Sequence, residues 1–205
     1  MKIILLILSV LNLSYLNSQV NEYDDNGNYL DPTHIGDQVW MAANLNTDKF
    51  ANGDQIPEAK SEKAWIEACT KKQAAWCYFE NKSKNGKIYG KLYNWYAVND
   101  PRGLAPKGWR IPTAEDVEKL VKIQWTTLDY DKDISYAFKG KYIACRFQDA
   151  LFSNKYQFWW TSKEISDVNS CAFSADGSCA DFEEYKVIGF RKGIGFPVRC
   201  ILENK

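Results

Sequence analysis

The stretch that decides the fold runs from Ala75 to Thr113 and reads AWCYFENKSKNGKIYGKLYNWYAVNDPRGLAPKGWRIPT. Its first half carries a dense group of aromatic residues: Trp76, Tyr78, Phe79, Tyr89, Tyr93, Trp95 and Tyr96. Aromatic side chains dominate the energetics of both protein cores and binding interfaces, so this density predicts one or the other. The stretch has the form of no common catalytic motif.

Turn and helix signals divide this stretch. Asn85-Gly86 predicts a turn between two strand-like runs, residues 76–79 and 88–95. The sequence Asp100-Pro101-Arg102-Gly103 predicts a second turn. Thr113-Ala114-Glu115-Asp116 resembles a capping box with Asp at its last position. We therefore expect a helix from this point to about residue 123.

The rest of the chain predicts few helices and many short strands. Ser61 is suited to cap a short helix over Glu62–Cys69, in which Trp65 and Cys69 share a face. Gln38–Met41 reads as a short apolar strand. Strand-like runs also cover 157–162, 170–174 and a final stretch that ends at residue 201. This mixture favours an α+β fold of short helices and a twisted, mostly antiparallel sheet.

The first 18 residues are typical of an export signal. Lys2 precedes a short apolar run that gives way to Asn17-Ser18-Gln19, and such a run is too short to span a bilayer. We expect a signal peptide over 1–18 and a single domain over 19–205. No second apolar stretch of that length follows, so no membrane insertion is expected after cleavage. The expected location is the cell surface or the extracellular space, with the periplasm as the alternative.

The charge balance argues against polyanionic partners. The chain has 26 basic and 26 acidic residues, and loss of Lys2 with the signal peptide leaves a net charge of −1. A chain without a basic patch lacks the electrostatic footprint of a nucleic-acid-binding protein. Its interspersed Lys and Glu residues also give no basic stripe for anionic lipid.

Six cysteines are present: Cys69, Cys77, Cys145, Cys171, Cys179 and Cys200. Export favours their oxidation, and an even number fits a disulfide-stabilised domain. Cys171 and Cys179 flank Ala175-Asp176-Gly177, which reads as a hairpin turn. A two-residue turn would place the two cysteines on opposite faces, whereas a longer loop would let them bond. Both outcomes stay open.

Catalytic and metal-binding patterns are weak. His34 is the single histidine, so nucleophilic catalysis of the Ser/His/Asp type would depend on it alone. Asp24, Asn26 and Asn28 invite comparison with a calcium loop, but Gly27 precedes Asn28 where an EF-hand needs Gly after its third ligand position. Adjacent carboxylates such as Glu115 and Asp116 are typical of solvated faces. We therefore predict no catalytic residues, no metal site, no cofactor and no enzymatic activity.

Several long motifs resemble one family. They are IGDQVWMAANLNT (35–47), FANGDQIPEA (50–59), AWCYFEN (75–81), NGKIYGKLYNWYAV (85–98), DPRGLAPKGWRIPT (100–113), WWTSKE (159–164) and GFPVRCI (195–201). In this order they are similar to the FISUMP, or "major paralogous domain", family of secreted and surface proteins of Bacteroidota. The resemblance covers roughly residues 23–202.

The resemblance implies a C-type-lectin-like fold related to formylglycine-generating-enzyme-like domains, with paired N- and C-terminal strands. It also implies a disulfide between Cys77 and Cys200, which both lie in family motifs. The functional residues of the related branches are missing. The strand Trp160-Thr161-Ser162 stands where calcium-dependent lectins have Trp-Asn-Asp, and the copper-binding cysteine pair of the oxidases is not evident.

The family aromatics are expected to be mostly core, which moves the search for a contact site elsewhere. Trp159 and Trp160 are neighbours, so on a strand their side chains point to opposite faces. We predict that at most one of them faces the core, and this pair is the candidate contact with a ligand or partner. Loops 126–156 and 163–192 are the other candidates, because specificity usually resides in loops on a rigid scaffold.

Taken together, the sequence predicts a secreted, non-enzymatic binding module. The leading hypothesis is an accessory subunit of a bacterial cell-surface or outer-membrane protein assembly, bound to a larger partner. The last predicted strand ends close to Lys205, so we expect attachment through another protein. The alternative is a glycan-binding adhesin, which requires an exposed Trp or Tyr flanked by Asn, Asp or Arg.

Overall fold

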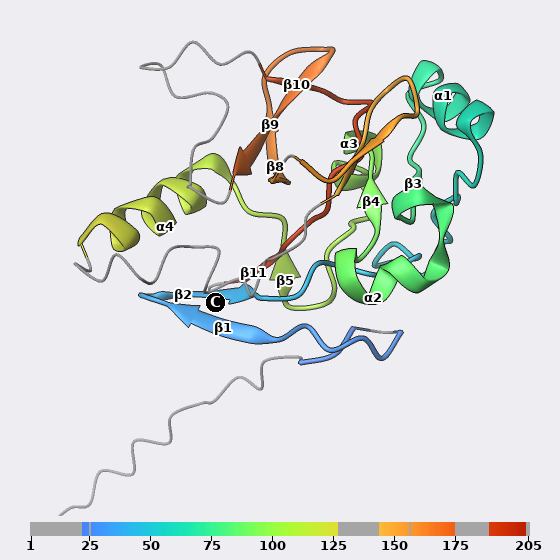
Figure 1. The fold of residues 1–205 in the computed structure, drawn as a ribbon. Helices are drawn as coiled ribbons and strands as arrows, with labels where there is room; N and C mark the ends of the chain where they lie inside the picture. Colours follow the sequence, from blue (N-terminus) through green and yellow to red (C-terminus); the bar gives the residue numbers. More distant parts are fainter. Residues whose placement is uncertain (1–21, 25, 127–143, 156, 175–188, 204–205) are drawn as a thin grey trace, which may run out of the picture.

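The computed structural model describes residues 22–24, 26–126, 144–155, 157–174 and 189–203, and this part of the chain is α+β (Figure 1). The predicted signal peptide lies outside the described residues. So do Cys179 and large parts of both candidate loops.

The strands are short, and every pair of them is antiparallel. In chain order they are β1 (Pro32–Ile35), β2 (Gln38–Met41), β3 (Trp76–Cys77), β4 (Leu92–Tyr93), β5 (Trp109–Arg110), β6 (Cys145–Arg146), β7 (Phe152–Ser153), β8 (Phe158–Glu164), β9 (Asn169–Ser174), β10 (Phe190–Arg191) and β11 (Ile201–Leu202).

The helices are short too: α1 (Glu62–Thr70), the 3₁₀ turns η1 (Phe79–Asn81) and η2 (Ser83–Asn85), α2 (Gly86–Tyr89), α3 (Trp95–Val98) and α4 (Ala114–Thr126). Helix α1 begins as predicted, because the Ser61 hydroxyl accepts a hydrogen bond from the Ala64 N–H at 3.1 Å. Trp65 and Cys69 are both buried on its inner face. The predicted cap, start and buried face of this helix are therefore confirmed.

A four-stranded sheet with the order β1-β2-β11-β5 joins the two ends of the domain. Ile201 of β11 lies opposite Trp40 of β2, and the Met41 N–H donates to the Cys200 carbonyl at 2.9 Å. The expected pairing of N- and C-terminal strands is confirmed. The last strand therefore lies inside the sheet, between β2 and β5.

A second sheet, β10-β9-β8, is covered on both faces (Figure 1). Trp159 pairs with Phe173, and both belong to a cluster with Val117 and Leu120 of α4. The next residue, Trp160, faces the opposite way into the main core. Alternation along β8 therefore supplies two different apolar clusters.

Helix α4 begins at the predicted capping box. The Asp116 N–H donates to the Thr113 hydroxyl at 3.3 Å, and the Thr113 N–H donates back to the Asp116 carboxylate at 2.7 Å. Arg110 adds two further hydrogen bonds to this carboxylate, at 2.5 and 2.8 Å. Burial raises the pKa of Asp116, but these donors outweigh it, and the net pKa is lowered.

The predicted tight turn at Asn85-Gly86 is wrong, although the strands it was expected to join do pair. Trp76 lies opposite Tyr93, but η1, η2 and α2 fill the connection, and Gly86 is the first residue of α2. A Cβ at Gly86 would lie 2.5 Å from the Tyr78 ring. Glycine is therefore needed at position 86 because the Tyr78 ring packs closely against the backbone there, and not because the chain makes a turn between two strands.

The predicted disulfide between Cys77 and Cys200 is also wrong, because both thiols are free and buried. Cys77 belongs to β3, which pairs with β4, whereas Cys200 precedes β11, which pairs with β2 and β5. Cys77 thus lies in one sheet, and Cys200 lies beside a strand of another. Cys171 is disulfide-bonded. Because Cys179 lies outside the described residues, the pairing of these two stays a prediction.

Candidate functional site

The predicted contact residues, Trp159 and Trp160, are both completely buried, so neither is available to a ligand in this structure. The Trp159 ring stacks on Phe173 at 5.4 Å, and its N–H donates to Asn44 Oδ1 at 2.9 Å. The Trp160 N–H donates to the Tyr93 carbonyl at 2.8 Å. The two side chains do point to opposite faces of the strand, as the alternation along a strand predicts. The prediction that at most one of them faces the core is wrong, because both faces of this sheet are covered.

Four buried cations are part of the scaffold. Each lies over a tryptophan ring, within 5.0 Å of its centroid: Lys91 over Trp76, Arg146 over Trp65, Lys192 over Trp95 and Arg199 over Trp159. Such cation–π pairs gain strength when both partners are desolvated. The charged groups also donate to backbone carbonyls or side-chain oxygens. They hold segments together and are not presented to a ligand.

Arg199 shows how one such cation connects distant segments. Its guanidinium donates to Asn44 Oδ1 at 2.8 Å and to the Ala42 carbonyl. Asn44 Oδ1 also accepts from Trp159, while its amide nitrogen donates to the Tyr89 carbonyl at 2.9 Å. The Asn44 amide therefore joins β8, the end of α2 and the C-terminal segment.

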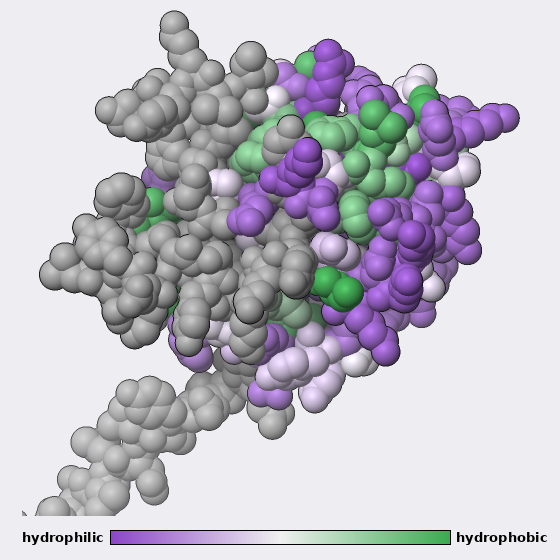
Figure 2. All heavy atoms as spheres, viewed as in Figure 1, coloured by the Kyte–Doolittle hydropathy of each residue, from purple (hydrophilic) through white to green (hydrophobic). Residues whose placement is uncertain are grey.

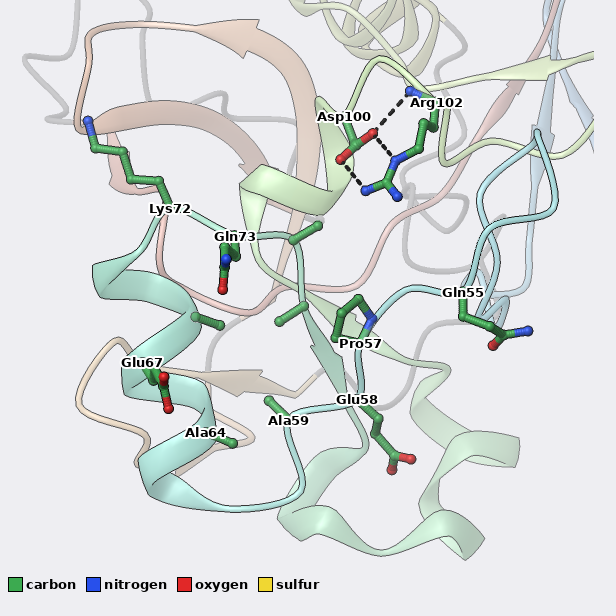
Figure 3. A pocket seen from close by; sticks show the side chains of 13 residues that line it. Gln55, Pro57, Glu58, Ala59, Ala64, Glu67, Lys72, Gln73, Asp100 and Arg102 are labelled. Carbon is green, nitrogen blue, oxygen red and sulfur yellow. Dashed lines mark hydrogen bonds and ion pairs between the residues drawn. The ribbon is translucent and has the colours of Figure 1, made fainter.

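A surface groove of about 560 Å³ lies in the described part of the chain (Figure 3). It lies between α1, the loop before it and the turn after α3. Its floor is made of small side chains: Ala59, Ala64, Ala68, Ala74 and Ala75. Its rim carries hydrogen-bonding side chains: Gln55, Glu58, Glu67, Lys72, Gln73, Asp100 and Arg102.

The Arg102 side chain is held in place at one end of this groove (Figure 3). Its guanidinium donates to both carboxylate oxygens of Asp100, at 2.8 and 2.9 Å, and to Asp54 at 3.2 Å. It also lies over the buried Phe50 ring at 4.0 Å. Hydrogen bonds from Arg102 lower the pKa of Asp100. At this end of the groove, Arg102 is therefore held by two carboxylates and one aromatic ring.

The chemistry of the groove suits recognition of a polar chain. Alanine side chains end at Cβ, so another backbone can approach the floor closely, while the rim offers both hydrogen-bond donors and acceptors. No Trp or Tyr lines the groove. The exposed aromatic ring that a glycan adhesin requires is therefore not found there.

The residues of the possible calcium loop form an internal hydrogen-bond network. The Asp24 carboxylate accepts from the Asn26 and Asn28 N–H groups at 2.9 and 2.8 Å, and from the Asn28 amide at 2.8 Å. The buried Lys91 ammonium supplies positive charge beside Asp24 and Asp48. These oxygens already have partners, and among the described residues no group of three His, Cys, Asp or Glu is arranged to hold a metal ion.

His34 lies exposed on β1, an edge strand. Of the paired carboxylates, Asp116 is occupied by Arg110 and Thr113, and Glu115 beside it is exposed. Within the described ranges, no helix is long and apolar enough to cross a membrane.

Among the described residues, the large exposed apolar side chains are Tyr23 and Tyr29, which are bridge partners near the start, and Ile66, Ile88, Leu151 and Val168, which come from separate segments. Figure 2 shows hydrophilic side chains over α1 and α2, and hydrophobic side chains gathered over the area of α3.

Comparison with protein families accounts for this scaffold. The family model described as the Fibrobacter succinogenes major domain matches residues 33–145, which is more than half of the chain. The chain belongs to this family. The match confirms the FISUMP resemblance, over a shorter range than the motifs suggested. No curated protein and no solved structure matches the chain.

Sequence reasoning missed the groove of this Fibrobacter succinogenes major domain. Its lining comes from three separate segments, 55–59, 64–75 and 100–102. The one available signal was compositional, because four alanines lie at residues 64, 68, 74 and 75 around a helix with polar neighbours. That pattern alone does not distinguish a groove floor from helix packing.

Proposed function

We propose that this chain is a secreted, non-enzymatic binding module that acts as an accessory subunit of a bacterial cell-surface or outer-membrane protein assembly. The groove beside α1 is the observation that carries the proposal. A segment of the larger partner would lie across its alanine floor and hydrogen-bond to the rim.

The scaffold supports a binding role. All seven tryptophans whose side chains the structure describes are at most 4% exposed: Trp40, Trp65, Trp76, Trp95, Trp109, Trp159 and Trp160. The scaffold is therefore closely packed, and a rigid surface loses little conformational entropy when a partner binds. The fixed Arg102 is a suitable anchor, since arginine is enriched among the residues that dominate interface energetics.

We also propose that the arrangement is a C-type-lectin-like fold. The pairing of β2 with β11 and the capped start of α4 after Trp109-Arg110 support it. In that fold, loops on a small core carry the contacts. Export by a signal peptide over 1–18, a surface location and a single domain over 19–205 belong to the same proposal.

The test is affinity capture from the native cell envelope with groove variants. Wild-type protein is expected to retain one defined envelope protein, identified by mass spectrometry. Ala68→Trp fills the groove floor and is expected to abolish retention of that protein. Lys63→Trp places the same side chain at an exposed position of α1 that does not line the groove, and is expected to retain it.

Each variant must first show an unchanged unfolding transition, because Ala68 is partly buried. Equal retention by wild type and Ala68→Trp would place the contact outside the groove. Gently solubilised protein that stays alone and monomeric would count against the accessory role itself.

A further inference from the structure

A small hairpin before β1 presents two tyrosine rings to solvent. Tyr23 and Tyr29 are 58% and 50% exposed, and they are bridge partners on antiparallel segments. Their ring centroids are 5.3 Å apart, with an angle of 53° between the ring planes. They are the only exposed aromatic pair among the large exposed side chains of the described residues.

The tyrosines are exposed because their neighbours along the chain are fixed inward. Asp24 and Leu30 alternate with them and are 7% and 2% exposed. Asp24 holds the turn through the N–H groups of Asn26 and Asn28, and the Asn26 amide donates to Asp48 at 3.1 Å. The inner face of the hairpin is therefore tied to the loop around residue 47, and the outer face carries the two rings.

Such a pair leaves apolar ring surface in water on a backbone that hydrogen bonds hold in place, which are two features of a preorganised contact site. We propose that Tyr23 and Tyr29 form a contact site for a neutral saccharide chain. A pyranose ring has an apolar C–H face and a polar rim of hydroxyl groups. The tyrosine rings fit the C–H face, and the phenol hydroxyls are able to hydrogen-bond the rim.

The size and composition of the site favour a saccharide over a protein. A stable protein interface buries about 800 Å² on each partner around an apolar centre. Among the described residues, the hairpin contributes two exposed rings, and the other large exposed apolar side chains come from α1, α2 and later segments. A partner protein would find no further large exposed apolar side chain on the described residues of the hairpin, whereas one or two sugar rings need only the tyrosines.

The site is separate from the groove and from the family core. Residues 23 and 29 precede the family match, which begins at residue 33, and neither lines the groove. Saccharide contact therefore goes beyond the proposed accessory role. It also gives the glycan-adhesin alternative a location that the sequence did not indicate.

Affinity electrophoresis of the full chain tests the proposal. Native gels would contain hydroxyethylcellulose, xylan, galactomannan or dextran, with alginate as a charged control. We expect at least one neutral polysaccharide to retard the wild type. Tyr23→Ala with Tyr29→Ala should weaken the apparent affinity by about ten-fold or more, the size typical of removing a hot-spot contact.

Two matched variants decide how the result is interpreted. Tyr23→Phe with Tyr29→Phe keeps both rings and is expected to retain most of the retardation. Ile88→Ala removes an equally exposed apolar side chain from α2 and should have no effect. Absence of retardation in every neutral gel, or retardation that the double alanine variant leaves unchanged, would overturn the proposal.

The two proposals fail independently. Capture of an envelope protein depends on Ala68 and the groove, whereas retardation in a polysaccharide gel depends on the tyrosines. If the double alanine variant instead lost the captured envelope protein and kept its retardation, the hairpin would be a protein contact and the saccharide proposal would be wrong.

Discussion

Two aromatic pairs of this molecule differ in their exposure to solvent. Trp159 and Trp160 are adjacent in the chain and completely buried, whereas Tyr23 and Tyr29 are six residues apart and about half exposed. Both pairs lie on extended backbone. The difference is that β8 is covered on both faces, while the N-terminal hairpin is covered on one. Exposure of an aromatic residue therefore depends on whether other elements pack against one face or both faces of its strand.

The largest expected effect comes from truncating the buried pair. Trp159→Ala or Trp160→Ala should each lower the free energy of unfolding by about 3–5 kcal/mol, because each leaves a large cavity. Tyr23→Ala should lower it by about 1 kcal/mol at most, because half of that side chain is already in water. Urea unfolding measures all three. Equal losses at Trp160 and Tyr23 would break the comparison.

Removing the N-terminal cap of α4 should weaken the packing of α4 against the Trp159 side of β8, and should leave the Trp160 side unchanged. Asp116→Asn loses part of the Arg110 contact and of the cap, which should lower the free energy of unfolding by about 2–3 kcal/mol at neutral pH. The pKa of Asp116 is lowered in the folded state, so this contribution is present above the unfolded pKa of about 4 and is lost as pH falls through the folded pKa.

Urea unfolding from pH 7 to pH 2 tests this prediction. The difference between wild type and Asp116→Asn should shrink below about pH 4, where the wild-type carboxylate takes up a proton. Glu118→Gln, in the same helix, should show little difference at any pH. A constant gap across the range would mean that the carboxylate charge has no role.

Freeing the hairpin should have a smaller effect. Asp24→Ala removes the acceptor of three hydrogen bonds and should lower the free energy of unfolding by about 1–2 kcal/mol. Amide hydrogen exchange should accelerate in a peptide covering residues 22–31 and stay unchanged in β8. Asn52→Ala, in an exposed turn, is the matched control. Faster exchange in β8 as well would mean that the hairpin supports the core.

The smallest expected effect is that the buried cysteines of the folded protein do not react with a thiol reagent. Burial raises the pKa of Cys77 to about 12 and of Cys69 and Cys145 to about 11, so few thiolates exist at pH 8. Iodoacetamide should leave the native protein unmodified and should label residues 69, 77, 145 and 200 after denaturation without reductant. Labelling of the denatured chain at residues 69 and 145 alone would instead indicate a Cys77–Cys200 disulfide.

Local signals in the sequence predicted the helices well. Ser61 and Thr113 mark the starts of α1 and α4, because capping depends on side chains within three residues of each other. The family motifs supplied the pairing of β2 with β11, which no local pattern indicates. The turn predicted at Asn85-Gly86 is wrong because glycine is also needed where an aromatic ring packs directly on the backbone. Here the Tyr78 ring packs on Gly86.

The candidate sites were harder to predict because exposure is a property of the assembled fold. Nothing in the sequence around Trp159 says that α4 covers one side of β8 and the main core the other. Tyr23 and Tyr29 flank the turn whose Asp24, Asn26 and Asn28 invite comparison with a calcium loop, and the alternation with buried Asp24 becomes evident only in three dimensions. The groove joins three segments, so no local pattern describes it.

The position of β11 limits when this domain can fold. It is the last strand among the described residues, yet it lies between β2 and β5. A polypeptide that emerges from a ribosome or a translocon with its N-terminus first lacks this central strand until residues 201–202 have emerged. The pairing of β2 with β11 is a contact between residues far apart in sequence, and the four-stranded sheet closes only after the residues between them have been made or translocated.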